Sequence, residues 1–282
     1  AGGLGSMRGA ALLLAAALAP AALASFEAAP PAPPSPYPLL RPTDYADILG
    51  ADFAWATANI PLFESANRTL DLAYYFRWRT YHSHIHPTNE TATPFVVTEF
   101  APKVGWAGKD NAINCAAGHH LAEAGWLTSS AVRDSITRWW VTSPQEENPG
   151  YYYWYASALK RNFDKNGDTS LLREVVPRYV RQFLRYANGS LPSRGAAFNS
   201  EADCLWNTPG NEGQEGSLSG PGCRTLVQSL MYGEASSLAV LCAAIGDSAC
   251  AAQMQAEAER WQRRVLRLWN PALDSFDTLR LG

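Results

Sequence analysis

The sequence lacks the motifs of several large enzyme classes. Its 282 residues contain no G-x-G-x-x-G dinucleotide fingerprint, no phosphate-binding loop with its lysine and no G-x-S-x-G nucleophile turn. The five cysteines form no C-x-x-C pair, so neither a zinc knuckle nor a thioredoxin-type motif is present. These absences argue against nucleotide-dependent enzymes, α/β-hydrolases and cysteine-based metal or redox sites.

The chain also has little net charge. It carries 23 lysines and arginines against 26 aspartates and glutamates, which gives a formal net charge of −3 and a pI near 6.0. Without a basic excess, neither a nucleic acid nor an anionic membrane surface is expected as a partner. Hydrophobic residues make up 47% of the chain, enough to bury the core of one large domain or two small ones.

After the N-terminus, no stretch is expected to cross a membrane. Residues 7–24 fit a secretory signal instead, with Arg8 as the positive end, an apolar stretch and Ala22-Leu23-Ala24 as the cleavage motif. Their apolar run is shorter than the roughly 20 residues that span a bilayer. We expect cleavage before Ser25 and interpret residues 1–6 as an artefact of translation or cloning.

A proline-rich stretch follows the signal. Residues 25–38 cannot hold a helix or a central strand, so we expect an extended linker. The predicted organisation is therefore a leader (1–24), this linker and a helical domain (39–282). Sequons for N-glycosylation begin at Asn67, Asn89 and Asn188. They agree with a glycoprotein that is secreted or kept in the secretory-pathway lumen.

An oxidising compartment favours pairing of the cysteines. Cys204 with Cys223 would close the base of a glycine-rich loop, and Cys242 with Cys250 would bridge two helices across a tight turn. Cys115 would then be left over, and we expect it to be buried.

From Thr69 onwards, large apolar residues recur at helical spacing and predict a helix that Pro87 ends. The predicted stripe consists of Leu70, Tyr74, Trp78, Tyr81 and Ile85. Three histidines fall in this stretch, but only His82 and His86 would share a helix face. Because no third ligand is nearby, no metal site is expected.

Two further aromatic helices are predicted. Ser129–Thr142 has a serine cap and would bury Val132, Ile136, Trp139 and Trp140. The second helix spans Pro149–Phe163 and includes the run Tyr151–Tyr155 (YYYWY). With 10 Trp, 12 Tyr and 10 Phe in the chain, many beside polar residues, we expect an aromatic-lined cavity.

Two Gly-Asp turns predict helix hairpins. Gly167-Asp168 separates two helical stretches, and Gly246-Asp247 separates Arg224–Ile245 from Ser248–Leu268. Residues 164–168 (DKNGD) imitate the start of a calcium loop, but its required glycine and glutamate are missing downstream. Repeated antiparallel hairpins indicate an all-α fold rather than a Rossmann or β-sandwich fold.

In the stretch from Asp203 to Glu234, a glycine-rich acidic loop interrupts this helical pattern and then runs directly into a helix. It places Glu212 and Glu215 three residues apart, with Trp206 nearby. Carboxylates beside an indole suit a sugar site, since one can donate a proton to a glycosidic oxygen while the indole stacks on the sugar ring. The alternative is a solvated surface loop.

Taken together, several segments resemble the (α/α)6-barrel glycoside hydrolases related to mannosylglycerate hydrolase and the processing α-glucosidase of the secretory pathway. The resemblance covers about Leu39 to Thr278. It rests on the segments LDLAYYFRWRTYHSHI, FVVTEFAPKVGWAGKDNAINCAAGHH, YYYWYASALKRNFDKNGD, GNEGQEGSLSG, RTLVQSLMYGEASSLAVLCAAIGD and LWNPALDSFDT.

The resemblance implies a partial (α/α)6 toroid and assigns roles within the loop. By position, Glu215 corresponds to the family's general acid, with Gly213 and Ser217 in matching places. Glu212 would raise the pKa of Glu215 by like charge. The family's general base lies in the second half of the barrel, so we expect a truncated toroid.

The implied activity is inverting hydrolysis of a terminal glycosidic bond in an oligosaccharide or glycoside, with no cofactor. Candidates for holding the carbohydrate substrate are Trp106, Lys109, Trp154, Trp206 and Arg224. One alternative is a non-catalytic carbohydrate-binding homologue that lacks the general base. Another is a purely structural helical repeat domain.

Overall fold

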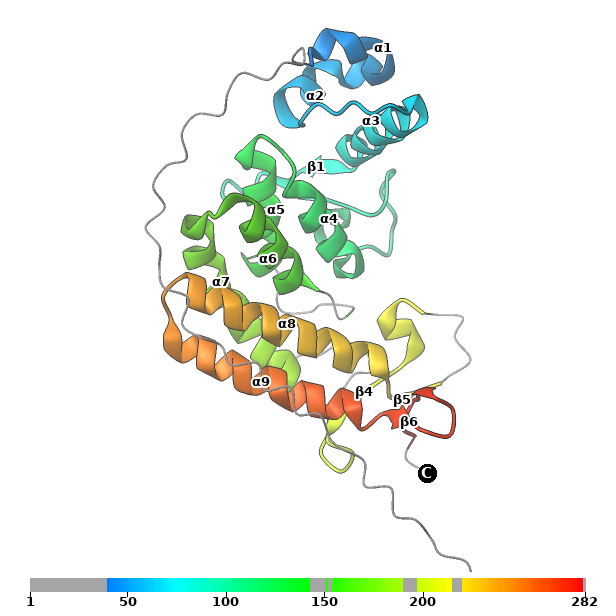
Figure 1. Ribbon diagram of the computed structural model, residues 1–282, viewed down its shortest axis with the longest axis vertical. Coiled ribbons are helices and arrows are strands. Elements are labelled where there is room, and N and C mark those ends of the chain that lie inside the picture. The colour runs from blue at the N-terminus through cyan, green and yellow to red at the C-terminus, as the bar shows by residue number, and fades with distance from the viewer. Residues whose placement is uncertain (1–39, 143–150, 152–153, 190–196, 215–219, 281–282) are drawn as a thin grey trace, which may run out of the picture. The chain divides into compact units, whose positions relative to one another are not determined.

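A computed structural model describes residues 40–142, 151, 154–189, 197–214 and 220–280. Helices dominate this part of the chain (Figure 1), as the sequence predicts. The first are the short α1 (Ala46–Leu49) and α2 (Phe53–Asn59), followed by the longer α3 (Arg68–Ser83). An antiparallel pair of strands then forms between β1 (Ile85–Pro87) and β2 (Phe95–Val97).

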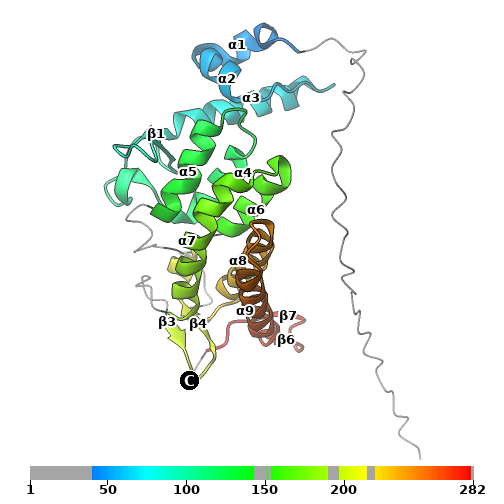
Figure 2. The ribbon, with the colours of Figure 1, turned by 90° about the vertical axis from the view of Figure 1, so that its left-hand side faces the viewer.

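The remaining helices pack in pairs around one core. Their bounds are α4 (Ala117–Ala124), α5 (Ser130–Thr142), α6 (Tyr155–Asn166), α7 (Thr169–Ala187), α8 (Thr225–Ala244) and α9 (Ser248–Leu266). Helix α8 packs along α9, and α6 packs against both α4 and α8 (Figures 1 and 2). The largest fully buried side chains include Trp139, Trp140, Trp261, Tyr75 and Tyr155.

Both predicted Gly-Asp turns are confirmed. Gly167 follows α6 with φ of 64°, a left-handed conformation that glycine adopts without steric cost, and Asp168 caps α7 by accepting from the Ser170 N–H. Gly246 has φ of 84°, and Asp247 caps α9 by accepting from the Cys250 N–H. The hairpins α6–α7 and α8–α9 therefore follow from local turn chemistry.

The prediction for the first aromatic helix is partly wrong. Helix α3 ends at Ser83, because Ile85–Pro87 pair with β2. His86 therefore lies in a strand and shares no helix face with His82, whose Nδ1 is 2.7 Å from Asp52 Oδ1. Leu70 is 55% exposed, and Tyr75 takes a buried place instead.

The other two aromatic helices are closer to expectation. Helix α5 buries Val132, Ile136, Trp139 and Trp140, as predicted. Helix α6 begins at Tyr155, six residues after the predicted start at Pro149. Of the predicted extra residues, 149–150 and 152–153 lie outside the described part of the chain.

One helix corrects the expectation that no later stretch could span a membrane. Thr225–Ala244 is the single helix in the described residues that is long and apolar enough to do so. However, 56% of its apolar window is buried, which is typical of a core helix. Its neighbours α6, α7 and α9 cover it within the fold.

Short strands connect the hairpins. An antiparallel sheet joins β3 (Ala197–Asn199), β4 (Cys204–Asn207) and β5 (Gly222–Cys223). A second small pair, β6 (Trp269–Asn270) and β7 (Ser275–Phe276), follows α9. The three-stranded sheet thus lies between α7 and α8 in the chain, and the second pair follows the last helix.

Both predicted disulfides are present. Cys204 and Cys223 join β4 to β5 with their Cα atoms 5.9 Å apart. Cys242 and Cys250 join α8 to α9 with their Cα atoms 5.6 Å apart. Cys115 is half-buried, whereas the sequence predicts it to be buried.

Candidate active site

The base of the acidic loop is fixed to α8. Strand β4 leads into the loop and β5 leads out of it, and the Cys204–Cys223 disulfide joins the two strands. From α8, the Gln228 side chain donates to the Leu205 carbonyl (2.8 Å) and accepts from the Leu205 N–H (3.3 Å). This fully buried amide pairs with β4 as a neighbouring strand would.

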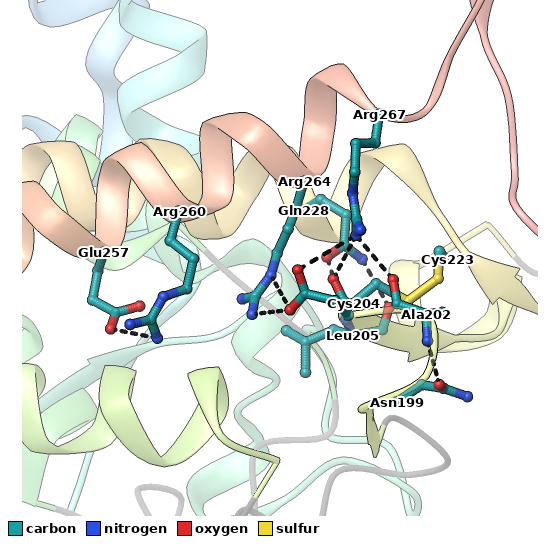
Figure 3. A network of polar contacts seen from close by, with 11 residues as sticks. Asn199, Ala202, Cys204, Leu205, Cys223, Gln228, Glu257, Arg260, Arg264 and Arg267 are labelled. Carbon is teal, nitrogen blue, oxygen red and sulfur yellow. Dashed lines mark hydrogen bonds and ion pairs between the residues drawn. A yellow bond between two sulfur atoms is a disulfide. The ribbon is translucent and has the colours of Figure 1, made fainter.

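Arg264 of α9 and Arg267, which directly follows this helix, hold the turn before β4 (Figure 3). The Arg264 guanidinium donates to Asp203 Oδ1 (2.6 Å), while Arg267 donates to the carbonyls of Ala202 (2.9 Å) and Asp203 (2.8 Å). Asp203 has a positive φ of 47°, which is uncommon for a residue with a side chain. The β3–β4 turn is thus tied to the same helix hairpin as the loop.

Within the loop, Glu212 and Arg224 form a buried ion pair. The Arg224 Nε donates to Glu212 Oε2 at 2.6 Å, and the Glu212 side chain has no exposed surface. The other guanidinium nitrogens of Arg224 donate to the Gln214 side chain (2.8 Å) and the Gly220 carbonyl (2.9 Å). Gln214 and Gly220 flank residues 215–219, so a single arginine binds both ends of that segment.

Residues 114–118, which form a short turn and the start of α4, contact both the acidic loop and the aromatic segment, here meaning the described residues Tyr151, Trp154 and Tyr155. A side chain on Gly213 would approach Cys115 Sγ to 3.2 Å, and one on Gly118 would collide with the Trp154 ring at 2.4 Å. Asn114 also pairs with the backbone of Tyr151, accepting from its N–H at 3.1 Å and donating to its carbonyl. Residues 114–118 therefore bring the loop and the aromatic segment close together.

Sequence reasoning missed the roles of Asn114 and Gly118. The available signal is the run Asn114–Gly118 (NCAAG), whose small residues permit close approach of neighbouring chain. Which side chains it would contact could not be predicted, since they lie tens of residues further along.

Two of the predicted sugar-binding tryptophans border this region. Trp154 is half-buried at the start of α6, with its ring edge-on to His119 at a centroid distance of 4.8 Å. Trp206 is half-buried on β4, opposite Cys223. Both residues are partly exposed, and the Arg161 guanidinium lies 5.3 Å from the centroid of the Trp154 ring.

The other two predicted contacts lie elsewhere. Trp106 is 64% exposed and packs edge-on to Phe100 at 4.6 Å. Lys109 forms an ion pair with Glu90, and this hydrogen bond raises the pKa of Lys109. In the described part of the chain, neither side chain bonds to the strands or turns that carry the acidic loop.

Comparison with known protein families identifies the family of the chain that carries this site. Residues 109–282, more than half of the chain, match the mannosylglycerate hydrolase MGH1-like glycoside hydrolase domain. The chain belongs to this family. The acidic loop, the aromatic segment and both Gly-Asp hairpins all fall within the matched residues of the MGH1-like domain. Membership in a glycosidase family implies a carbohydrate ligand.

A solved structure supports the fold of the MGH1-like domain. A chain titled "Sialidase" superposes with a TM-score of 0.75 at 24% sequence identity, over 86% of this chain and 24% of that one. The present chain therefore spans about a quarter of the length of that structure. Packed helix pairs that match part of a larger glycosidase confirm the predicted partial α/α toroid. A comparison with curated proteins found no match.

A further carboxylate of the MGH1-like domain, that of Glu234, is buried and hydrogen-bonded to other parts of the protein. Glu234 of α8 is 2% exposed and accepts hydrogen bonds from the N–H groups of Ala156 and Ser157 and the hydroxyls of Ser157 and Tyr179. Burial raises the pKa of Glu234, although all four donors favour its carboxylate form. Glu234 thereby caps the first turn of α6 from a neighbouring helix.

The proposed acid itself lies outside the described residues. Glu215 directly follows Gln214 and belongs to the segment 215–219, so its role as the acid stays a prediction from the sequence. Of the predicted site residues, the structure brings Glu212 and Arg224 together. It places Trp154 and Trp206 on the elements around the loop.

Proposed function

We propose that this MGH1-like chain carries the general acid of an inverting glycoside hydrolase that cleaves a terminal glycosidic bond in an oligosaccharide or glycoside. Glu215 would protonate the leaving oxygen, and a separate carboxylate would activate water on the opposite face of the sugar. The observation that carries the proposal is the grip of Arg224 on Gln214 and Gly220. Gln214 and Gly220 are the described residues on either side of the segment 215–219, and a general acid must be held close to the leaving oxygen for proton transfer.

The geometry favours a supporting role for Glu212. Its buried carboxylate already accepts from Arg224, so it has no exposed surface with which to meet a substrate. We therefore propose Glu215 as the acid and Glu212 as the anchor of Arg224.

Trp154 and Trp206 are the proposed stacking surfaces for the sugar. Both residues are partly exposed, Trp206 on the strand that leads into the loop and Trp154 next to Gly118, and sugar rings pack on apolar ring faces. Trp106 and Lys109 would contact a longer substrate further out. The two disulfides support the proposed secreted or lumenal location, because such bonds persist in oxidising compartments.

The alternative is a carbohydrate-binding protein that does not hydrolyse. It is favoured by the engagement of Glu212 with Arg224 and of Glu234 with four donors, which leaves neither available as a general base. Such a protein would keep the aromatic surfaces and lack the activated water.

Substitutions at the two loop carboxylates distinguish these functions. Oligosaccharide binding is measured by tryptophan fluorescence, and hydrolysis is measured with a panel of aryl glycosides and oligosaccharides. In a longer protein that also carries the second half of the barrel, where the resemblance places the general base, we expect Glu215→Gln to lower hydrolysis by about 10²- to 10⁴-fold while binding stays nearly unchanged, since general acid catalysis contributes about that much. Glu259→Gln on the exposed side of α9 serves as the matched control.

The outcomes separate the two proposals. Binding together with hydrolysis that depends on Glu215, and a released sugar of inverted anomeric configuration by NMR, supports the hydrolase. Binding without measurable hydrolysis in a longer protein that also carries the second half of the barrel supports the binding protein. A stable Glu212→Gln variant that loses hydrolysis while Glu215→Gln retains it would show that Glu212 is the acid.

A further inference from the structure

A separate cavity lies between α3, α4 and the segment before α3. Its volume is about 320 Å³, and it shares no lining residue with the acidic loop. Five aromatic rings and one proline form most of its wall, namely Pro61, Phe63, Tyr74, Trp78, Tyr81 and Trp126. The size is at the lower end of the range for small-molecule sites.

The polar tips of the wall are already bonded to the protein. The Tyr74 hydroxyl donates to the Pro61 carbonyl (2.6 Å), and the Tyr81 hydroxyl donates to the His120 carbonyl (2.9 Å). These tyrosines therefore contribute ring carbons to the cavity, with their hydroxyls committed elsewhere. A ligand rich in hydroxyls would lose its hydration there and find few partners in return, among them Glu123 Oε2, which accepts no hydrogen bond from the described residues.

The charged groups of the wall compensate one another. Arg77 donates from Nε to Glu123 Oε1 at 2.8 Å and from Nη2 to the same oxygen. Arg77 and Glu123 are the remaining lining residues, so this part of the wall carries no net charge. Neither a cation nor an anion would be preferred over a neutral molecule.

Ring geometry favours an aromatic ligand over an aliphatic one. Trp78 meets Tyr74 at an interplanar angle of 73° and Tyr81 at 76°, so the wall presents both ring edges and ring faces. Another ring can continue this edge-to-face packing. Trp126, which is 59% exposed, forms the solvent side of the lining, with the Lys165 ammonium 4.1 Å from its centroid.

We propose that this cavity binds a small neutral aromatic molecule of one or two fused rings. An apolar cavity of about 150 Å³ takes up benzene, so a volume of about 320 Å³ accommodates a second ring. The site is independent of the proposed hydrolase function, because its lining and its ligand chemistry differ from those of the acidic loop.

Titration of 5-fluoroindole followed by ¹⁹F NMR tests this site. We expect binding to the unaltered chain with a Kd of about 0.1 to 1 mM, a range common for ligands of this size. Trp126→Ala and Phe63→Ala should each weaken binding by about fivefold to tenfold. Both side chains are partly exposed, so the fold should tolerate their loss. Trp269→Ala is the matched control, since its ring is exposed but lies outside the cavity.

Three results would overturn the proposal. They are absence of binding to the unaltered chain, an equal loss of affinity in Trp269→Ala, and displacement of 5-fluoroindole by a methyl glycoside at comparable concentration. The last result would make the cavity a sugar site. Loss of hydrolysis in the loop variants with unchanged fluoroindole binding would leave this proposal supported.

Discussion

Arg224 is the residue on which the loop depends most. Its guanidinium holds Glu212, Gln214 and Gly220, and its side chain is only 6% exposed. Buried pairs of this kind contribute modestly when intact, because desolvation offsets their attraction, but removing one partner leaves an uncompensated charge. The effect of a substitution should therefore appear first in stability.

We expect Glu212→Gln to lower the free energy of unfolding by about 3 kcal/mol, since it leaves the Arg224 charge buried without its carboxylate. Urea denaturation measures the change. Glu174→Gln, which breaks a half-exposed pair with Arg138, should cost less than about 1 kcal/mol. Equal losses in the two variants would contradict a special role for the buried pair.

His120 should make stability depend on pH. Burial, helped by the nearby charge of Arg77, lowers the pKa of His120 to about 4 from 6.5. The unfolded chain therefore binds a proton that the folded chain excludes between these values. Stability is full above pH 6.5 and falls by about 3 kcal/mol as the pH drops towards 4.

Denaturation curves at a series of pH values test the role of His120. The difference in stability between the unaltered chain and His120→Gln should change steadily from pH 7 to pH 4, because glutamine does not titrate. A constant difference across that range would show that His120 keeps its proton in the folded state.

At the level of secondary-structure elements, features set by neighbouring residues could be predicted from the sequence, whereas features set by distant contacts could not. The turns at Gly167-Asp168 and Gly246-Asp247 were predictable because glycine and an aspartate cap specify the chain reversal within a few residues. The limits of α3 and α6 were not predictable in this way. Pairing of Ile85–Pro87 with a later strand ends the pattern that reads as helix.

The candidate site shows the same division. Its loop could be found from composition, and the Cys204–Cys223 bridge from its position around that loop. The partnership of Glu212 with Arg224, and the contacts of Asn114 and Gly118, depend on segments brought together by folding. Nothing in the spacing of those residues encodes such contacts.

The two disulfides should differ in their contribution to stability. Cys204 and Cys223 are 19 residues apart, whereas Cys242 and Cys250 are 8 apart. On the chain-entropy model, replacing both cysteines by alanine should cost about 3 kcal/mol for the first pair and about 2.5 kcal/mol for the second. Thermal unfolding of the two double variants compares them. A larger loss for the second pair would show that native contacts, not chain entropy, dominate.

Considered as a whole molecule, the chain exposes apolar side chains on two long helices. Leu72 and Phe76 of α3 and Leu226 and Val240 of α8 are all solvent-exposed. Apolar side chains exposed together on a helix-hairpin fold indicate surfaces that can pack against another element or another chain.

The cap that Glu234 provides for α6 has a consequence for biosynthesis. Glu234 is the tenth of the 20 residues of α8, the one described helix apolar enough to enter a bilayer. A charge at the centre of an inserting helix costs about 2.5 to 3.5 kcal/mol. A translocation channel that reads hydropathy before the chain folds would meet this carboxylate at the least favourable position for insertion. If the chain is secreted as proposed, the same side chain would oppose insertion of α8 into the bilayer, and after folding it accepts from the N–H groups of the first turn of α6.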